Sequence, residues 1–372
     1  MNQEKFKKLV SGEKAGPIYT VSRLFLNVVA VFYRLGIALR NWLYDRGTAR
    51  SYAVTSAGLV TIDKTQAAVP VISVGNITVG GTGKTPMVIW LCNFLRKKNI
   101  DRAILTRGYK SRARGHSDEP AILVKNCPGA AIVINPDRLA GAIEAVKRNH
   151  AQVLIMDDGF QHRRLHRDID IVTIDSTLPF GYNRILPAGL LREPVSSLKR
   201  AHAIILTRCD LVSKDDLIKL EKTIKDINPG LVIARTIHAP VCARGAGNKE
   251  IPLEKLRAKN VFAFCGIANP DAFFATIDSL GVNLIGSKIY NDHHAYTAGD
   301  VNEICRDAGG LKADLILTTE KDYDKITLPP DSRTDLILVY LAVELRFIEG
   351  QDRISQLIER SLTVKIHGKR TA

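Results

Sequence analysis

The chain has 372 residues, of which 45% are hydrophobic and 24% are charged. This composition excludes a disordered chain, and the length exceeds what one hydrophobic core usually supports, so we expect two domains rather than a small cross-linked scaffold. Lysine and arginine outnumber aspartate and glutamate by 53 to 38, a net charge of +15, which favours an anionic partner: nucleic acid, acidic lipid or phosphate.

Cysteine and aromatic usage narrows the class further. The six cysteines are scattered and none forms a Cys-x-x-Cys pair, which argues against a zinc ribbon and against a secreted disulfide framework. A reducing cytosol fits best. Aromatic residues make up only 6% of the chain, and no RNA-recognition or zinc-finger pattern interleaves with the basic runs, so the sequence predicts no nucleic-acid partner.

The first 45 residues stand apart from the rest. Residues 24–39 read LFLNVVAVFYRLGIAL, which is shorter and more interrupted than a typical membrane span. Basic residues flank this stretch, and Trp42 and Tyr44 follow it where interfacial aromatic side chains are common. We expect residues 1–45 to form a helical segment associated with a membrane surface, with a buried helix docked on the next domain as the alternative.

A glycine-rich turn supplies the strongest local signal. A β-branched run at 70–74 precedes GNITVGGTGKTP, and a helix-like stretch follows, which is the setting of a phosphate-binding loop (P-loop). In that chemistry Lys84 reaches the β- and γ-phosphates, and the Thr85 hydroxyl ligates Mg²⁺. The predicted nucleotide-binding residues are Thr78, Val79, Gly80, Gly81, Thr82, Gly83, Lys84 and Thr85.

The match to the fingerprint G-x-x-x-x-G-K-[ST] has one departure. Gly83, Lys84 and Thr85 fill its last three places, but Thr78 stands where the first glycine belongs. Gly80 and Gly81, which follow at once, offset this departure in part. A glycine-rich hairpin turn without a ligand is the alternative, but turn chemistry does not explain the Gly-Lys-Thr trio.

A pair of acids ends a second apolar run. Residues 153–156 read VLIM and lead into Asp157 and Asp158. Parallel strands deliver their carboxyl ends to one crevice, so these carboxylates are expected on the Mg²⁺ side of the site. An ordinary Asp-Gly turn would account for only one of the two acids.

Further strands are predicted at 103–106, 168–175 and 201–207, alternating with helical stretches. The expected fold is therefore α/β, with a mostly parallel sheet of the P-loop NTPase type covered by helices on both faces, over residues 46–237. The strand at 103–106 leads into Arg107 and a charged loop that contains Asp118; alone, this loop reads as solvated surface, although its cations suit an anionic substrate.

The rest of the chain, residues 238–372, is expected to form a smaller α/β domain. Strands are predicted at 231–234, 261–265, 282–289, 313–318 and 336–340. Two groups of polar residues depart from the alternation of apolar strands and helices. The first is Asp292, His293 and His294 in a predicted loop, and the second is residues 319–322 at the end of a strand. No cysteine or third histidine lies nearby at ligand spacing, which argues against zinc. Proton transfer by a histidine and an ordinary surface loop both remain open.

Seven segments carry a resemblance to a known family: VGNITVGGTGKTP (74–86), LTRGYK (105–110), SDEP (117–120), DDGFQHRRLHRDIDIVTID (157–175), LPAGLLREP (186–194), DHHAYT (292–297) and TTEKDYDKI (318–326). In this order, they resemble the tetraacyldisaccharide 4′-kinases of lipid A biosynthesis. The resemblance covers nearly the whole chain, and several of its blocks are long and unusual.

The resemblance implies transfer of the γ-phosphate of ATP, with Mg²⁺, to the 4′-hydroxyl of a tetraacyldisaccharide 1-phosphate. It places this reaction at the cytoplasmic face of the bacterial inner membrane. A lipid disaccharide 1-phosphate and a membrane surface are then the expected partners, with no nucleic acid and no obligate protein partner. One acidic amphiphile would account for the net positive charge and for the basic, apolar start of the chain.

The resemblance also implies residue roles. Asp118 corresponds to a general base that a histidine of the second domain assists, which maps onto His293, with His294 as its neighbouring competitor. Ser117 replaces the glycine common before that aspartate. The family blocks also place Gln161, Arg192 and Glu193 at the site as possible contacts, together with Arg107.

A P-loop ATPase of the partitioning or metal-insertion type is the alternative, because its loop is similar. Those proteins carry a second lysine early in the loop, at or near the place of Val79, and this chain has none. That reading also leaves LPAGLLREP and the apolar N-terminal stretch without a role.

Overall fold

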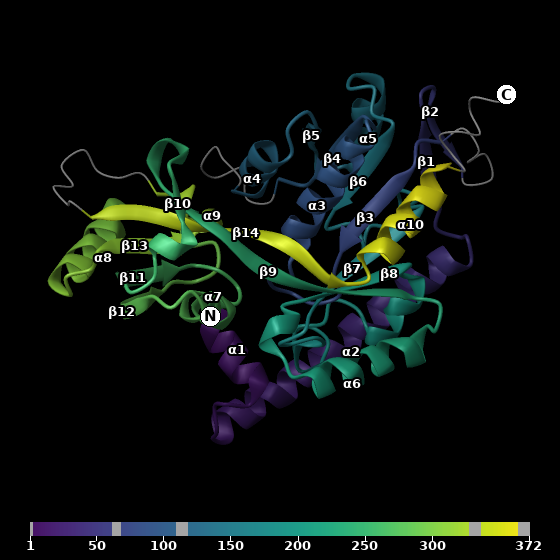
Figure 1. The fold of residues 1–372 in the computed structure, drawn as a ribbon. Coiled ribbons are helices and arrows are strands. Elements are labelled where there is room, and N and C mark those ends of the chain that lie inside the picture. The colour runs from purple at the N-terminus through teal and green to yellow at the C-terminus, as the bar shows by residue number, and fades with distance from the viewer. Residues whose placement is uncertain (1–2, 62–67, 109–117, 327–335, 364–372) are drawn as a thin grey trace. The chain divides into compact units, whose positions relative to one another are not determined.

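The computed structural model describes residues 3–61, 68–108, 118–326 and 336–363, and the chain divides into two compact units (Figure 1). The P-loop unit comprises Lys8–Ile237 and the chain from Phe347 onward; the second unit comprises His238–Arg346 and the first residues of the chain. The sequence predicted two boundaries, between residues 45 and 46 and between residues 237 and 238, whereas in the structure residues 8–45 group with the P-loop unit. The chain crosses back at residue 347 as well, so the last helix belongs with the P-loop unit.

A parallel sheet forms the centre of the P-loop unit. Its strand order is β5-β4-β6-β3-β7-β8-β9. The strands are β3 (Val71–Gly75), β4 (Arg102–Thr106), β5 (Ala131–Ile134), β6 (Val153–Asp157), β7 (Ile169–Asp175), β8 (Ala203–Thr207) and β9 (Val232–Arg244). All residues of β3, β4, β6, β7 and β8 are buried, as near-continuous apolar runs in parallel sheets predict. β3 and β6 are neighbours, and Val74 pairs with Asp157.

Helices cover both faces of this sheet (Figure 1). Successive residues of a strand point to opposite faces, so Leu154 and Met156 of β6 pack with Leu139 and Ala142 of one helix, α5. Another core cluster joins β7 and β8 to a second helix, α6. The helices are α3 (Lys84–Lys97), α4 (Asp118–Asn126), α5 (Arg138–Lys147), α6 (Lys214–Ile227) and α10 (Gln351–Leu362), and a hairpin of β1 (Tyr52–Thr55) and β2 (Gly58–Thr61) precedes β3.

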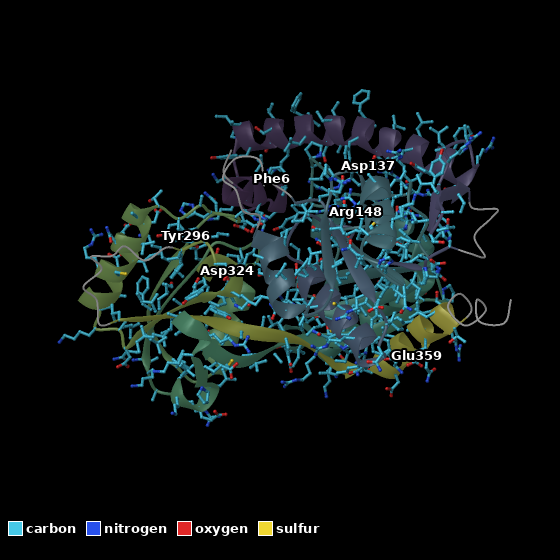
Figure 2. The ribbon with its side chains drawn as sticks, turned by 90° about the horizontal axis from the view of Figure 1, so that it is seen from above. Phe6, Asp137, Arg148, Tyr296, Asp324 and Glu359 are labelled. Atoms are coloured by element: carbon cyan, nitrogen blue, oxygen red, sulfur yellow. The ribbon has the colours of Figure 1, made fainter. Side chains whose placement is uncertain are left out.

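The N-terminal segment contains two helices, α1 (Gln3–Ser11) and α2 (Pro17–Asp45). By length and composition α2 is apolar enough to cross a bilayer: its best window of 18 residues has a mean hydropathy of 1.5, and 0% of that window is buried. In Figure 2, helix α2 is the long purple helix at the top of the view, and many of its side chains point outward, away from the ribbons below it. The helix is much longer than the apolar stretch at 24–39 because polar and aromatic residues extend it at both ends.

The second unit is a smaller α/β layer. Alternate residues of its strand β11 face opposite sides, so Ala263 packs with Phe273 of helix α7, whereas Phe264 lies in the cluster of Ile304 from helix α8. Its strands run parallel in the order β12-β11-β13-β14. The elements are β10 (Glu250–Pro252), β11 (Asn260–Cys265), α7 (Pro270–Ser279), β12 (Asn283–Ile289), α8 (Ala298–Gly310), β13 (Leu315–Thr319), α9 (Glu320–Tyr323) and β14 (Ile337–Glu349).

Five short 3₁₀ helices complete the described elements: η2 (Gly181–Asn183), η3 (Val195–Arg200), η4 (Cys209–Leu211), η5 (Ala246–Asn248) and η6 (Leu253–Lys255). The predicted fold class is confirmed: a mostly parallel P-loop-type sheet with helices on both faces, a second α/β unit and an apolar N-terminal helix. The predicted strands at 231–234 and 336–340 are only the first parts of β9 and β14, which have 13 residues each.

Candidate active site

The P-loop connects the end of β3 to the start of α3. Gly80 and Gly83 have φ angles of 122° and 84°, a backbone conformation that residues with a Cβ rarely adopt. Gly83 is the N-cap of α3, and this helix has neither a side-chain cap nor an acidic residue in its first turn. The positive end of its dipole and its first N–H groups can therefore accept an anion. Lys84 and Thr85 are the first two residues of the helix.

Buried threonines anchor the middle of this loop. The Asn76 amide donates a hydrogen bond of 3.0 Å to the Thr82 hydroxyl, which shares one of 2.8 Å with the hydroxyl of Thr173 on β7. Thr173 in turn donates to the carbonyl of Gly75 at 3.3 Å. From β8, the Thr207 hydroxyl donates to the Thr82 carbonyl at 3.2 Å. Three neighbouring strands thus hold the loop before any ligand binds.

A buried ion pair supports the other limb of the loop. Arg208, which follows β8, donates to the Gly81 carbonyl at 2.9 Å and to the carboxylate of Asp175 at 2.5 Å. Burial lowers the pKa of Arg208, although the nearby carboxylate of Asp175 favours its charged form. Thr173 and Asp175 lie in the segment 157–175 that carries the family resemblance, but the sequence assigned neither of them a role. Arg208 follows a predicted strand and belongs to no motif.

Asp158 lies beside the first residue of α3. Its carboxylate Oδ1 is 3.6 Å from Lys84 Nζ, and one guanidinium nitrogen of Arg192 lies 2.9 Å from both of its oxygens. Burial raises the pKa of this carboxyl, but the charges of Lys84, Arg192 and Arg107 outweigh it and lower the pKa to about 2. The carboxylate is therefore ionised at neutral pH.

The backbone after β6 turns sharply to place this acid. Asp158 has a φ of 52°, and short polar side chains tolerate this left-handed region better than most. The next residue, Gly159, leaves no room for a side chain, because a Cβ there would lie 2.6 Å from Ser73 Oγ. Asp157 is the last residue of β6 and is 5% exposed; its carbonyl accepts a hydrogen bond of 3.0 Å from Arg138.

The segment LPAGLLREP runs along the first limb of the P-loop. Val79 N–H donates to the carbonyl of Leu190 at 2.8 Å, and Arg192 N–H donates to the carbonyl of Ile77 at 2.7 Å. Thr78, between these two bonds, forms a β-bridge with Leu191. This pairing carries the Arg192 guanidinium to Asp158.

The remaining predicted contacts of this unit have different surroundings. Gln161 donates to the Asn76 carbonyl at 2.9 Å, next to the P-loop. Arg107 is exposed at the end of β4, and its charge acts on Asp158. Glu193 is completely buried, and Arg40 and Arg200 each lie 2.7 Å from one of its carboxylate oxygens. Glu193 thus joins helix α2 to the rest of the P-loop unit.

Asp118 is the first residue of α4, and its side chain lies outside the part of the chain that the structure describes. The same holds for residues 109–117 of the preceding charged loop. The general-base role of Asp118 therefore stays a prediction. The described start of α4 follows β4, two strands from β3 in the sheet order.

In the second unit, His293 and His294 have different partners. His293 has a φ of 61°, and its Nε2 lies 3.2 Å from the Lys321 ammonium. Because an ammonium can only donate, Nε2 is the acceptor in this contact. Lys321 Nζ is also 3.6 Å from Asp292 Oδ1. The motifs at 292–297 and 318–326 therefore meet in space.

The ring of His294 lies in an aromatic cluster. It stacks on Tyr290 with a centroid distance of 4.6 Å and meets Tyr296 edge to face at 4.9 Å. Its Nε2 is 3.2 Å from Asp300, which belongs to the capping box at the start of α8. These contacts give His294 a structural setting that His293 does not share.

Asp322 anchors the turn before these histidines. It is 0% exposed and accepts hydrogen bonds of 2.8 Å from Gly266 N–H and from the Thr319 hydroxyl. The Gly266 carbonyl in turn accepts from His293 N–H at 3.1 Å. The acid of the TTEKDYDKI segment thereby fixes the backbone that carries His293.

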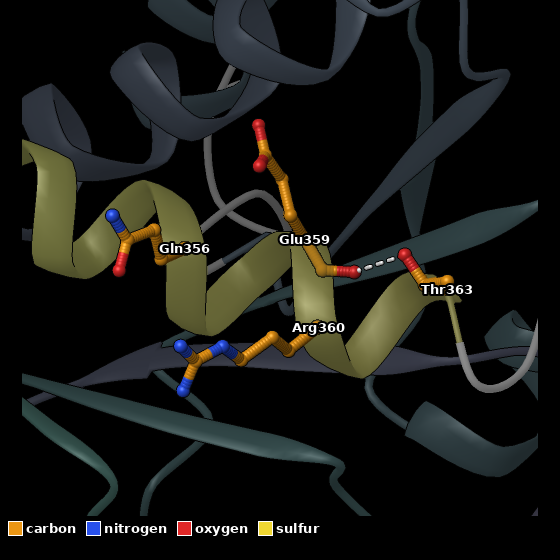
Figure 3. A pocket seen from close by; sticks show the side chains of 4 residues that line it. All are labelled: Gln356, Glu359, Arg360 and Thr363. Carbon is orange, nitrogen blue, oxygen red and sulfur yellow. Dashed lines mark hydrogen bonds between the residues drawn. The ribbon is translucent and has the colours of Figure 1, made fainter.

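A shallow hollow lies at the C-terminal helix, apart from these motifs. It has a volume of about 430 Å³ and is lined by residues of α10 and its end, including Glu359 and Arg360 (Figure 3). Glu359 forms an ion pair of 2.6 Å with Lys98 of the P-loop unit. The lining residues belong to none of the sequence motifs, so we assign the chemistry to the P-loop side.

Comparison with known proteins decides the family. A family model described as tetraacyldisaccharide-1-P 4′-kinase matches residues 22–363. This chain belongs to that family. It is 35% identical over 360 residues to the tetraacyldisaccharide 4′-kinase of Syntrophus aciditrophicus, covering 90% of this chain and 92% of the relative. The corresponding enzyme of Geobacter metallireducens is 36% identical over 335 residues, covering 86% and 92%.

A solved structure agrees. The crystal structure of LpxK from Aquifex aeolicus in complex with ATP is 27% identical, with a TM-score of 0.66, and covers 91% of this chain and 99% of its own. The resemblance seen in the sequence is thus confirmed, and the chain is a kinase of lipid A biosynthesis. This membership sets aside the partitioning or metal-insertion ATPase as the alternative.

Proposed function

We propose that this kinase transfers the γ-phosphate of ATP to the 4′-hydroxyl of a tetraacyldisaccharide 1-phosphate at the cytoplasmic face of the bacterial inner membrane. The observation that carries the proposal is the position of the ionised Asp158 carboxylate, 3.6 Å from Lys84 at the start of α3. Lysine, helix terminus and carboxylate then meet at one end of the sheet, where a triphosphate and its counter-charges are required.

In this proposal the P-loop binds the nucleotide phosphates. Gly80 and Gly83 let the backbone approach phosphate oxygens, and Lys84 neutralises charge on the β- and γ-phosphates. Arg107, exposed beside Asp158, adds positive charge on the same side. The buried anchors at Thr82 hold this arrangement before ATP arrives, which reduces the entropy lost on binding.

The residues present fit a magnesium ion. Mg²⁺ prefers oxygen ligands and commonly uses one or two carboxylates together with substrate phosphates. Thr85 is the second residue of α3, and Asp157 ends β6, the neighbouring strand of β3, with Asp158 directly after it. Among the described residues no group of three or more His, Cys, Asp or Glu side chains gathers around a common point. When bound, the ion would neutralise charge on the transferring phosphate.

Asp118 and His293 are proposed to act on the acceptor. A sugar hydroxyl is a weak nucleophile, so a carboxylate within hydrogen-bond reach must accept its proton as the new O–P bond forms and ADP leaves. We assign this role to Asp118, with His293 orienting the base. His293 is preferred over His294, because the latter is engaged by Tyr290 and Asp300.

Helix α2 is proposed to associate with the membrane that holds the lipid substrate. Its large exposed apolar side chains include Phe25, Phe32, Leu35 and Leu39, at spacings that follow one side of a helix. Basic residues are frequent around it, and the whole chain carries a net charge of +15. Apolar burial and attraction to anionic lipid would therefore act together.

The transfer is tested with radiolabelled ATP, Mg²⁺ and a monophosphorylated tetraacyl glucosamine disaccharide. Label should enter the lipid with the wild-type protein, and Lys84→Ala and Asp118→Ala should lose at least about a hundredfold in turnover. Asp101→Ala, which removes an exposed acid of the same unit, is the matched control and should stay within twofold. Full turnover by Asp118→Ala would contradict the assignment of the base.

The membrane role has its own assay. Flotation with vesicles that contain anionic phospholipid should recover the wild-type protein, and Phe32→Gln combined with Leu35→Gln should reduce the recovered fraction. Ile218→Gln removes another large apolar side chain, 58% exposed, from a different helix, α6, and serves as control. Equal flotation of all three proteins would rule out this surface.

A further inference from the structure

Residues 190–193 connect three parts of the P-loop unit. The backbone of this segment pairs with the first limb of the P-loop through Arg192 N–H and the Ile77 carbonyl, 2.7 Å apart. In the same segment, the Arg192 guanidinium holds both oxygens of Asp158 at 2.9 Å. A shift of this backbone would therefore move the P-loop limb and the carboxylate together.

The neighbouring side chain, Glu193, faces helix α2. Arg40 of α2 lies 2.7 Å from its Oε1, and Arg200 lies 2.7 Å from its Oε2. The carboxylate is 0% exposed, so its charge is compensated by these two guanidinium groups rather than by water. Burial raises the pKa of Glu193, but Arg200 and Arg40 outweigh it, and the net shift is downward.

Arg200 ties this cluster to the turn that carries the acids. Its guanidinium lies over the ring of Phe160, 4.6 Å from the centroid, two residues after Asp158. The backbone of Phe160 packs so closely on Gly75 that a Cβ at Gly75 would lie 2.7 Å from the Phe160 nitrogen. Glu193 is thus linked to Asp158 by two routes, one through Arg192 and one through Arg200 and Phe160.

Tyr33 and Arg40 of α2 make hydrogen bonds to this segment. Tyr33, Ile37 and Arg40 lie at helical spacing on one side, and the Tyr33 hydroxyl donates to the Arg192 carbonyl at 3.3 Å. The exposed apolar residues, such as Phe32 and Leu39, follow the other side. The helix that is exposed to the lipid side thus contacts, on its inner side, the segment that holds Asp158.

We propose that Glu193 is a positioning residue, which transmits the docking of α2 to Arg192 and through it to Asp158. The inference rests on the proposed role of Asp158 at the metal side of the site. Loss of the Arg40 contact leaves the buried Glu193 carboxylate with only one of its two arginine partners. Residues 190–193 then shift, so that the uncompensated negative charge is less buried. The carboxylate beside Lys84 then leaves its productive position.

The test is Arg40→Gln, which removes the charge from α2 and keeps a long polar side chain. Supports of metal-binding residues typically contribute about 10-fold to 100-fold in metal affinity or activity. We expect kcat to fall about tenfold, and calorimetry to show about tenfold weaker Mg²⁺ binding to the complex with a non-hydrolysable ATP analogue. Binding of this analogue in EDTA should change less than twofold. Arg40→Lys, which restores a cation at the same place, should recover most of the loss.

Asp45→Asn is the matched control. Asp45 also joins α2 to the rest of the P-loop unit, through an ion pair of 2.7 Å with Arg163 rather than through Glu193 or Arg192. A general loosening of α2 would affect Asp45→Asn and Arg40→Gln alike, whereas the proposed route affects only Arg40→Gln. Equal losses in the two variants, or an unchanged Mg²⁺ affinity in Arg40→Gln, would overturn the proposal.

A double-mutant cycle follows the route itself. In an Arg192→Gln background, Arg40→Gln should have little further effect, because both changes act on the same carboxylate. Multiplied losses would contradict the proposed route. Asp158→Asn separates this inference from the proposed function: full activity of Asp158→Asn would remove the assignment of Asp158, whereas an inactive Asp158→Asn with a normal Arg40→Gln would remove only the role of Glu193.

Discussion

Thr82→Val tests whether buried hydroxyls hold the P-loop. The substitution keeps the shape of a side chain that is 3% exposed but removes two hydrogen bonds, from Asn76 at 3.0 Å and with Thr173 at 2.8 Å. Each buried hydrogen bond contributes about 1 kcal/mol net, and a polar partner left unpaired adds to the cost. We therefore expect the free energy of unfolding to fall by about 2 kcal/mol.

Urea unfolding monitored by tryptophan fluorescence measures this fall in the free energy of unfolding for the P-loop unit. The chain has two tryptophans, Trp42 and Trp90, and both lie in the P-loop unit. Thr223→Val is the control, because Thr223 is exposed on α6 and its hydroxyl bonds only to the carbonyl one turn back. Its cost should stay within about 0.5 kcal/mol.

The hydrogen bond between the Thr82 and Thr173 hydroxyls allows a second test. Thr173→Val removes the partner hydroxyl, so the double variant with Thr82→Val should lose less than the sum of the two single losses. If Thr82→Val costs no more than Thr223→Val, the buried hydroxyls do not stabilise the loop and the reasoning is refuted. A strictly additive double variant would show that the two hydroxyls do not interact.

Three further predictions concern acid stability, backbone space and the two histidines. Burial, with help from nearby arginines, lowers the pKa of His162 to about 4 from the ordinary 6.5, so the unfolded chain takes up a proton that the folded chain excludes. Stability should fall as the pH drops from 6.5 to 4, by at most about 3 kcal/mol, and His162→Gln should reduce that fall in urea titrations. Gly75→Ala should destabilise the fold by at least about 1 to 3 kcal/mol because its Cβ would meet backbone atoms, whereas Gly36→Ala, with nothing within 4 Å, should stabilise α2 by up to about 1 kcal/mol; thermal melting compares them. His293→Ala should lower kcat without changing the melting temperature, and His294→Ala should do the reverse; equal effects would contradict their separate roles.

The sequence predicted the strands of the P-loop unit closely. Apolar β-branched runs predicted β3 at 70–74, where the structure has Val71–Gly75, and β6 at 153–156, where it has Val153–Asp157. Strands buried on both faces have to be apolar at almost every position, so the run itself defines the strand. The parallel pairing of Val74 with Asp157 then follows from the βα alternation.

The long strands were harder to predict. β9 continues ten residues beyond the predicted end at residue 234 (244 − 234) and includes Pro240, a residue that usually argues against a strand. Its burial pattern is mixed rather than continuous, and β14 has the same character toward its end. The sequence near Phe347 does not indicate that the chain returns there to the P-loop unit. The Phe347 ring packs on Trp90, which lies 257 residues earlier (347 − 90), so the contact depends on the tertiary fold.

Glu193 shows the limit of motif reasoning at the site. The motif indicated that this acid matters and suggested a contact within the site. The structure instead gives the buried Glu193 two arginine partners, one of them Arg40, which lies 153 residues away in the chain. The spacing within a motif indicates which residues lie on the same element. Their partners on other elements depend on the tertiary packing. The same holds for Lys321 and His293, whose motifs met only in the folded chain.

Thr78 shows how the structure accounts for a departure from a fingerprint. The position lacks the first glycine of the P-loop pattern, yet its φ is not positive, and a β-bridge to Leu191 holds it in an extended conformation that suits a β-branched residue. The positive φ angles fall instead at Gly80 and Gly83. A glycine is required where the backbone is left-handed or crowded, so the pattern can lose its first glycine while the loop keeps its form. By this reasoning, alanine should be tolerated at position 78 and should destabilise the loop at positions 80 and 83.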